Sequence, residues 1–215
     1  ESLLITNPES IIKVSIQSNR KDKRAAELIK ILAREKIPYL SSDRNELDRI
    51  AKGEVHQGVI SEVILPPLLN EESLFKSISE NFSKPLLLVL DSIQDPRNLG
   101  ACLRSANAAG VNYVVINKDG SAPINALVHK TSAGAINSLK IFHVTNLSRT
   151  IIEIQKRGIW VIGLDGNSKS TIYDVNLTDA TAIVMGAEGK GIRRLIKKTC
   201  DQIVTIPMSG NVESL

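Results

Sequence analysis

The chain has 215 residues, of which 42% are hydrophobic and 3% aromatic, and it carries 27 basic against 23 acidic side chains. A chain of this length can form one large domain or two small ones, each with a buried core. Its pI near 9.1 suits a polyanionic partner, whereas so few aromatic residues argue against binding of single strands mainly by base stacking.

The first 66 residues have the pattern of a small α/β unit. An amphipathic helix is expected over 22–37, because its apolar residues fall on one face and Pro38 ends it. A short strand at 39–40 precedes a second helix, capped by Asp43 and running to Lys52, and a strand follows over 58–65.

A basic cluster lies near the start of this unit, and it consists of Lys13, Arg20, Lys21, Lys23 and Arg24. Such a cluster is either a solvated loop that leads into the helix or a surface that contacts RNA. The sequence favours neither interpretation over the other.

The range 67–84 is expected to be a linker with some helical content, because it follows the Pro66-Pro67 pair and is polar from Asn70 onward. Pro85–Leu90 is wholly apolar, as in a buried parallel strand. Further strands and helices are expected to alternate to the end of the chain, which predicts a parallel sheet wrapped by helices with ligand sites at the carboxyl ends of the strands. The expected strands are 113–116, 140–144, 159–163, 182–185 and 202–206, and the expected helices are 99–109, 124–133, 147–156 and 192–198.

Cysteines and histidines give no sign of a metal site. Cys102 and Cys200 are far apart, and His56, His129 and His143 show no metal-ligand spacing with them or with one another. No secretory leader or long apolar run precedes the cysteines, so we expect reduced thiols, a cytoplasmic protein and no membrane association.

The segment 90–110 could carry chemistry, because it leaves a strand and opens a helix. Asn98 is a suitable N-cap, and the apolar residues after it would form a buried stripe. Arg104 then lies off the core face and points towards the mouth of the sheet. Taken alone, this pattern favours an ordinary capped helix with a surface arginine.

The segment Gly186–Gly191 also leaves the end of a strand. Its glycines permit positive φ angles and a close approach of the backbone to a ligand. It is neither a phosphate-binding loop of the Walker type nor a dinucleotide fingerprint, because the required spacing and Lys-Ser/Thr pair are absent. In isolation it would most often be a turn.

Together with Ile206–Leu215, these two segments closely resemble the ordered motifs of the SpoU (TrmH) family of knotted RNA 2′-O-ribose methyltransferases. The resemblance implies a knotted SPOUT-type α/β methyltransferase domain with a parallel sheet over 85–215. It implies a ribosomal-protein-like α/β domain that binds the RNA substrate over 1–66, to which the His56-Gln-Gly-Val59 segment fits less distinctively.

The resemblance also implies the roles of individual residues. Asn98 and Arg104 would act at the reaction centre with Ser214, and Glu188 would order the site. S-adenosylmethionine would bind at Gly186, Ile206 and Leu215. Because a guanidinium with a pKa above about 12 is a poor base, we expect Arg104 to bind the RNA phosphate and stabilise the developing alkoxide, with the proton acceptor left open.

The family pattern continues past Leu215 with an asparagine, a serine and a helix. We therefore expect the carboxyl end of the domain to be incomplete at Leu215. The cofactor pocket and a homodimer interface should both depend on the residues that the family has beyond this position.

The function implied is S-adenosylmethionine-dependent 2′-O-methylation of RNA, closest to the branch that acts on a guanosine of 23S ribosomal RNA. One alternative is a tRNA 2′-O-methyltransferase of the same fold, although such enzymes often lack the amino-terminal domain. The other is a catalytically idle RNA-binding protein, against which the presence of Asn98, Arg104 and Glu188 argues.

Overall fold

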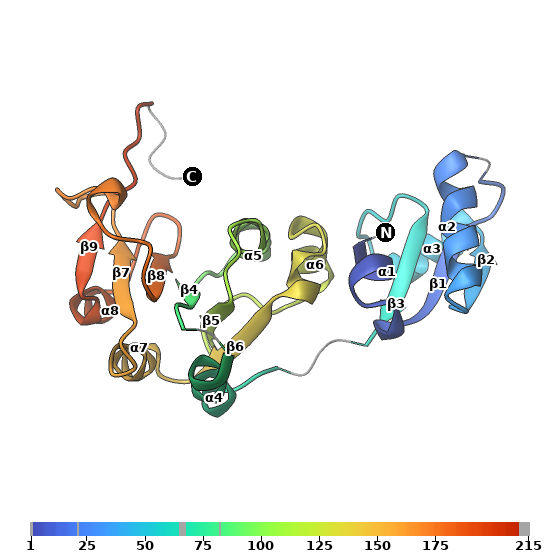
Figure 1. Ribbon diagram of the computed structural model, residues 1–215. Coiled ribbons are helices and arrows are strands. Elements are labelled where there is room, and N and C mark those ends of the chain that lie inside the picture. Colours follow the sequence, from blue (N-terminus) through green and yellow to red (C-terminus); the bar gives the residue numbers. More distant parts are fainter. Residues whose placement is uncertain (1, 21, 65–67, 82, 211–215) are drawn as a thin grey trace. The chain divides into compact units, whose positions relative to one another are not determined.

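The computed structural model describes residues 2–20, 22–64, 68–81 and 83–210. It divides the chain into two compact units, Glu1–Pro67 and Leu68–Leu215 (Figure 1). None of the described helices combines the length and the apolar character that a membrane span requires.

The first unit is a three-stranded sheet with helices, in the strand order β2-β1-β3. Strand β1 pairs in parallel with β2 and antiparallel with β3. Leu28 and Leu32 of α2 are buried with Val14 and Ile16 of β1, so one face of the helix covers the sheet. The elements are α1 (Ser2–Thr6), a 3-10 turn η1 (Pro8–Ser10), β1 (Ile11–Gln17), α2 (Lys23–Arg34), β2 (Tyr39–Ser42), α3 (Arg44–Ala51) and β3 (Val59–Val63).

Both longer helices of this unit begin at an aspartate. The Asp22 carboxylate accepts a 3.0 Å hydrogen bond from the Ala25 amide, and Asp43 accepts one of 2.9 Å from Glu46. The predicted cap at Asp43 is confirmed, and α2 ends at Arg34, ahead of Pro38.

The second unit holds a six-stranded sheet in the order β6-β5-β4-β8-β7-β9. Every pairing in it is parallel, as the sequence predicts. Its elements are α4 (Glu71–Asn81), β4 (Leu86–Asp91), α5 (Pro96–Ala108), β5 (Tyr113–Asn117), α6 (Ala126–Thr131), η2 (Ala135–Ser138), β6 (Lys140–Val144), α7 (Leu147–Gln155), β7 (Trp160–Leu164), η3 (Ile172–Asp174), β8 (Thr181–Gly186), α8 (Arg194–Thr199) and β9 (Gln202–Val204).

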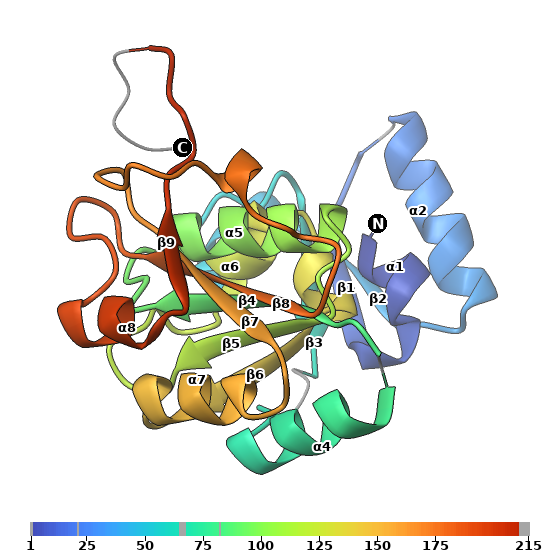
Figure 2. The ribbon, with the colours of Figure 1, turned by 60° about the vertical axis from the view of Figure 1, so that its left-hand side comes forward.

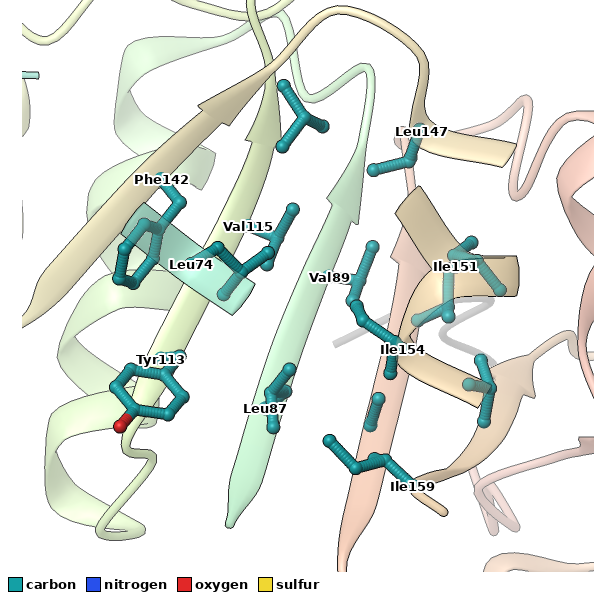
Figure 3. Close-up of a cluster of buried hydrophobic side chains, with 14 of the residues drawn as sticks. Leu74, Leu87, Val89, Tyr113, Val115, Phe142, Leu147, Ile151, Ile154 and Ile159 are labelled. Atoms are coloured by element: carbon teal, nitrogen blue, oxygen red, sulfur yellow. The ribbon is translucent and has the colours of Figure 1, made fainter. Parts of the chain in front are cut away.

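Helices cover both faces of this sheet (Figures 1 and 2). On one face, Leu87 and Val89 of β4 join a cluster with residues of α4, α7 and α8, part of which Figure 3 shows. On the other, Leu88 and Leu90 pack with residues of α5 and α6. The apolar run at 85–90 is therefore a central strand buried on both sides, as expected for a parallel sheet.

The interpretation of 67–84 as a linker is wrong for α4. Leu74 and Ile78 of this helix are buried in the core of the second unit. The Tyr113 hydroxyl donates a 2.8 Å hydrogen bond to the Ser77 carbonyl, and the Arg157 guanidinium lies 4.2 Å from the centre of the Phe75 ring. The helix belongs to the second unit because its sparse apolar side chains, four residues apart, reach a hydrophobic core that composition alone does not reveal.

Helices α5 and α6 are in close contact at Gly100. A Cβ atom at this position would lie 1.8 Å from Thr131 Oγ1 and 3.0 Å from the Ser132 amide nitrogen. Only glycine allows this approach, which brings the helix that carries Asn98 and Arg104 firmly onto its neighbour.

Candidate active site

The order of the strands along the second sheet reverses at β4. Strands β4, β5 and β6 follow one another outward to one edge, whereas β8 pairs with the other side of β4. In open α/β sheets, ligands bind at the carboxyl ends of the strands where the order reverses. That position is occupied by the start of α5, after β4, and by the loop after β8.

Asn98 and Glu188 meet there. The Asn98 side-chain amide donates a 2.8 Å hydrogen bond to Glu188 Oε2, and the bond is exposed to solvent. The sequence places these two residues in separate motifs, and the structure brings them together across β4 and β8.

The expectation that Asn98 is the N-cap of α5 is wrong. Asp95 is the N-cap, because its carboxylate accepts a 2.7 Å hydrogen bond from the Arg97 amide and Pro96 occupies the first helical position. Proline suits that position, since it has no amide hydrogen to leave unsatisfied. Asn98 therefore lies in the first turn, where its side chain is free to reach Glu188.

The glycine loop is closed by its own backbone. A Cβ atom at Gly186 would lie 2.0 Å from the Gly191 carbonyl carbon, and the Gly191 amide donates a 2.8 Å hydrogen bond to the Ala187 carbonyl. Gly189 and Gly191 have φ angles of 72° and 62°. The backbone that approaches Gly186 closely is thus the backbone of the loop itself, at the end of β8.

Asp91 and Arg193 form a contact that the sequence motifs do not predict. Asp91, the last residue of β4, is fully buried, and its carboxylate accepts hydrogen bonds of 2.8 Å from the Arg193 amide and 2.7 Å from Arg193 Nε. The Ser92 hydroxyl donates a third bond of 3.2 Å to it. In the sequence, the only sign of this contact is an acidic residue at the carboxyl end of an apolar strand. In the structure, Asp91 holds the start of α8 beside the glycine loop.

Arg104 is not joined to the Asn98–Glu188 pair. It is exposed on α5, and within the described part of the chain it forms no hydrogen bond or ion pair. Arg104 lies six positions after Asn98, which corresponds to about 9 Å along the helix axis. Its guanidinium is therefore available to a ligand.

The residues assigned to the cofactor are partly within the described ranges. Gly186 ends β8, and half-buried Ile206 follows β9, with β7 between these strands. The two strand ends are thus about 10 Å apart, two interstrand spacings. Half-buried backbone at one end and an aliphatic side chain at the other fit an extended ligand with an apolar ring. Ser214 and Leu215 lie outside the residues that the structure describes.

Asp165 follows β7, between the ends of β8 and β9. Lys197 Nζ lies 2.6 Å from its carboxylate. This hydrogen bond holds the pKa of Asp165 below its usual value. The ion pair therefore fixes the loop after β7 to α8.

The basic cluster of the first unit divides into two groups. Lys13 pairs with Glu62 at 3.0 Å, and the Arg20 guanidinium contacts Asp22 and donates a 2.6 Å hydrogen bond to the Gln57 carbonyl. Lys23 and Arg24 are exposed, and no contact among the described residues neutralises them. Lys21 lies outside the described ranges.

Histidines and cysteines form no cluster with other ligand residues that could hold a metal within the described ranges. Burial lowers the pKa of His129 and of His143. Burial is also the main cause that raises the pKa of Cys200 to about 11, so this thiol is not a nucleophile near neutral pH.

Two known protein families match the chain. Residues 85–215 match the model of the SpoU rRNA Methylase family, and residues 1–67 match the family described as RNA 2′-O ribose methyltransferase substrate binding.

Curated relatives cover the whole chain. The 23S rRNA (guanosine-2′-O-)-methyltransferase RlmB of Haemophilus ducreyi is 46% identical over 100% of this chain and 87% of the relative. The RlmB of Escherichia coli K12 is 42% identical over 100% of this chain and 88% of its own.

Solved structures share the fold. The SpoU methyltransferase AviRb from Streptomyces viridochromogenes, in complex with the cofactor AdoMet, covers 100% of this chain and 82% of its own, with a TM-score of 0.75 and 20% identity. A TrmH/SpoU tRNA modifying enzyme of A. aeolicus covers 67% of this chain and 75% of its own, with a TM-score of 0.55 and 26% identity.

Proposed function

The chain belongs to the SpoU rRNA methylase family, and we propose that it transfers the methyl group of S-adenosylmethionine to a guanosine 2′-hydroxyl in 23S ribosomal RNA. The chemistry rests on one observation, the hydrogen bond that joins Asn98 to Glu188 where the strand order reverses. The substrate follows from relatives that carry this activity in their names at 42–47% identity across nearly all of the chain.

Asn98 and Glu188, from the two motifs, have different roles at the ribose. Because Glu188 accepts from the Asn98 amide group, it orients the side chain and leaves the Asn98 carbonyl oxygen to accept from the 2′-hydroxyl. The unpaired Arg104 binds the RNA phosphate and stabilises negative charge that develops on the ribose oxygen. Ser214 completes the set assigned to catalysis by the resemblance.

The cofactor would be held by Gly186, Ile206 and Leu215. When bound there, S-adenosylmethionine supplies a methyl group that its sulfonium has already activated. The protein must therefore align the 2′-hydroxyl with that methyl group, assist the loss of the hydroxyl proton and exclude competing water.

The proposal extends to the assembly and location of the protein. The chain beyond Ile206 would thread to form the trefoil knot of the family, and two copies would associate as a homodimer in the cytoplasm. Light scattering should give the mass of a dimer, and a monomer that methylates RNA normally would refute the assembly without affecting the chemistry.

The rRNA substrate is preferred to tRNA because the match to the RlmB relatives includes the first unit. The tRNA modifying enzyme covers only 67% of the chain. An idle RNA-binding protein is the third candidate, and the ordered Asn98–Glu188 pair favours an enzyme over it.

The test is transfer of tritium from labelled S-adenosylmethionine to 23S rRNA or to tRNA, followed by digestion and mass spectrometry of nucleosides. We expect 2′-O-methylguanosine from rRNA only. Methylated tRNA would support the alternative substrate, and absence of transfer to either RNA would refute the enzyme.

Arg104 variants test the assignment of the residue. Arg104→Ala should abolish methylation while cofactor affinity stays nearly unchanged, and Arg104→Lys should also fail because an ammonium lacks the planar two-point fork. Lys76→Ala, an exposed change on α4, is the matched control. Methylation by Arg104→Ala at the wild-type rate would remove the assignment.

A further inference from the structure

A groove with a volume of ≈ 140 Å³ lies in the first unit, where β1 ends and α2 begins. Its lining combines an apolar part from α2 and β2 with polar side chains from the end of β1. The lining includes Gln17, Asn19, Arg20, Ile29, Tyr39 and Leu40. Its lining includes Gln17 to Arg20, so the groove lies at the carboxyl end of β1, beside the crossover helix α2, a common place for ligands at parallel strands.

Next to this groove, residues 56–58 form a turn in which Gln57 has a φ angle of 52° and an exposed side chain. A non-glycine residue in this left-handed region is strained, and such strain persists only where the surroundings impose it. Here the Gly58 amide donates a 3.0 Å hydrogen bond to His56 Nδ1, and His56 Nε2 lies 2.9 Å from the Asp48 carboxylate.

Arg20 connects the groove to the turn. Arg20 lines the groove, and its guanidinium contacts Asp22 and donates a hydrogen bond to the Gln57 carbonyl. Gly58 closes the junction, because a Cβ atom there would lie 2.9 Å from Gln17 Oε1 and 3.0 Å from Arg20 Nη1. The groove and the turn therefore form one built structure, from which the Gln57 side chain is exposed.

Two positive charges without an ion-pair partner among the described residues lie on the helix that lines the groove. Lys23 and Arg24 begin α2, which also supplies part of the groove lining, and neither is neutralised within the described ranges. The guanidinium of Arg20, in contrast, is already engaged by Asp22 and Gln57. Positive charge beside a small, partly apolar groove matches a nucleotide, whose base is flat and whose phosphate is anionic.

We infer that this groove and the Gln57 turn bind one unpaired nucleotide of the RNA, an inference that rests on the proposed function. Tyr39 and Ile29 would contact the base, Gln57 and Asn19 would donate and accept hydrogen bonds at its edge, and Lys23 and Arg24 would bind its phosphate. The groove is too small for a double helix, and specific RNA recognition commonly uses unpaired bases in loops.

The experiment measures fluorescence anisotropy of the intact protein with two labelled RNA probes, a hairpin with a single-stranded loop and a fully paired duplex. Wild type should bind the hairpin more tightly. Tyr39→Ala and Gln57→Gly should each weaken hairpin binding at least about fivefold, the lower range for loss of one base contact. Unchanged hairpin affinity in both variants would overturn the inference and leave the groove to another class of partner.

Two features keep the variants interpretable. Glycine adopts the φ angle of Gln57 without strain, so Gln57→Gly removes the side chain and preserves the turn. Tyr39 is already 44% exposed, so its truncation does not open the core. Melting temperature should not fall in Gln57→Gly, and S-adenosylmethionine affinity should not change in either variant.

Lys23→Ala and Lys30→Ala are a matched pair, since both remove one exposed lysine from α2. Lys23→Ala should weaken hairpin binding more, and equal losses would refute a site located at the start of the helix. Methylation of 23S rRNA separates the two proposals. If wild type methylates no RNA, the proposed function fails, whereas normal methylation with an unchanged KM for RNA in Tyr39→Ala and Gln57→Gly refutes the groove alone.

Discussion

Asn98 and Glu188 lie 90 positions apart in the sequence, and a 2.8 Å hydrogen bond joins their side chains. The bond spans the two neighbouring strands β4 and β8, so it depends on the central pairing of the sheet. Each residue restricts the rotamers of the other. The two motifs are therefore joined into one structural unit.

The Asn98–Glu188 bond predicts that the effects of substitution are not additive. Asn98→Ala and Glu188→Ala should each lower kcat about 10- to 100-fold, as expected for loss of a hydrogen bond to a charged group at the proposed reaction centre. The double variant should be little worse than either single one, because the second change removes a contact that the first has already broken.

Single-turnover methylation of 23S rRNA by the four proteins measures this coupling. Circular dichroism of each variant controls for folding, and it should not change because the bond is exposed to solvent. Losses that multiply in the double variant would show that the two residues act independently.

Gly186 and Gly189 predict opposite results for the same substitution. In Gly186→Ala, the new Cβ would lie 2.0 Å from backbone, so the loop must move, and such overpacking costs about 1–3 kcal/mol. Gly189→Ala meets nothing within 4 Å and carries only the strain of a φ angle of 72°, about 1 kcal/mol.

Calorimetric titration with S-adenosylmethionine should show no binding by Gly186→Ala and near-normal binding by Gly189→Ala. Thermal unfolding of both variants separates loss of the pocket from loss of the fold. Equal affinities in the two variants would mean that the backbone of the loop does not border the cofactor.

The Asp91–Arg193 pair predicts an asymmetry between its partners. Arg193→Met leaves a fully buried carboxylate without its cation and should destabilise the protein by about 3 kcal/mol. Asp91→Asn leaves a guanidinium that is 54% exposed and can be hydrated, so its cost should be smaller, about 1 kcal/mol.

Urea unfolding of the intact protein measures both costs. Lys84→Met is the matched control, because its 2.7 Å ion pair with Asp179 is about 60% exposed on both sides and should contribute less than about 1 kcal/mol. A larger loss for Asp91→Asn than for Arg193→Met would contradict the burial argument.

The pH dependence of stability should include a contribution from His129. Burial lowers its pKa in the folded state, and its Nε2 atom has no partner in the described part of the chain. The folded state then binds fewer protons than the unfolded state. This contribution is present above the unfolded pKa near 6.5 and is lost as pH falls through the lower folded value.

The melting temperature should therefore fall from pH 7 towards pH 5, and His129→Leu should make that fall shallower. A series at pH 8 supplies the reference, because histidine is neutral there in both states. A slope that does not change in His129→Leu would assign the dependence to other groups.

Local patterns predicted the elements well where one signal dominated. The strand over Lys140–Val144 has the predicted bounds, and Asp43 caps its helix as expected. At the start of α5, two capping residues compete, and Asp95 prevails over Asn98 because Pro96 suits the first helical position.

Contacts between distant segments could not be predicted in this way. Asp91 and Arg193 are 102 positions apart, and neither has a local pattern that requires the other. The sequence of helix α4 resembles a linker because it is mostly polar. The burial of its Leu74 and Ile78 depends on the sheet of the second unit. The catalytic roles of Asn98, Arg104 and Glu188 could be predicted only from the resemblance of whole motifs to a known family.

The bridge between Leu69 and Phe142 has a consequence for solubility. Strand β6 is at one edge of the sheet, and its His143 amide donates a 2.8 Å hydrogen bond to the Leu69 carbonyl. An uncovered edge strand is a template for pairing with other molecules. The segment at Leu69 therefore covers part of this edge and reduces its tendency to aggregate. Insertions beside Leu69 should lower solubility before they affect methyl transfer.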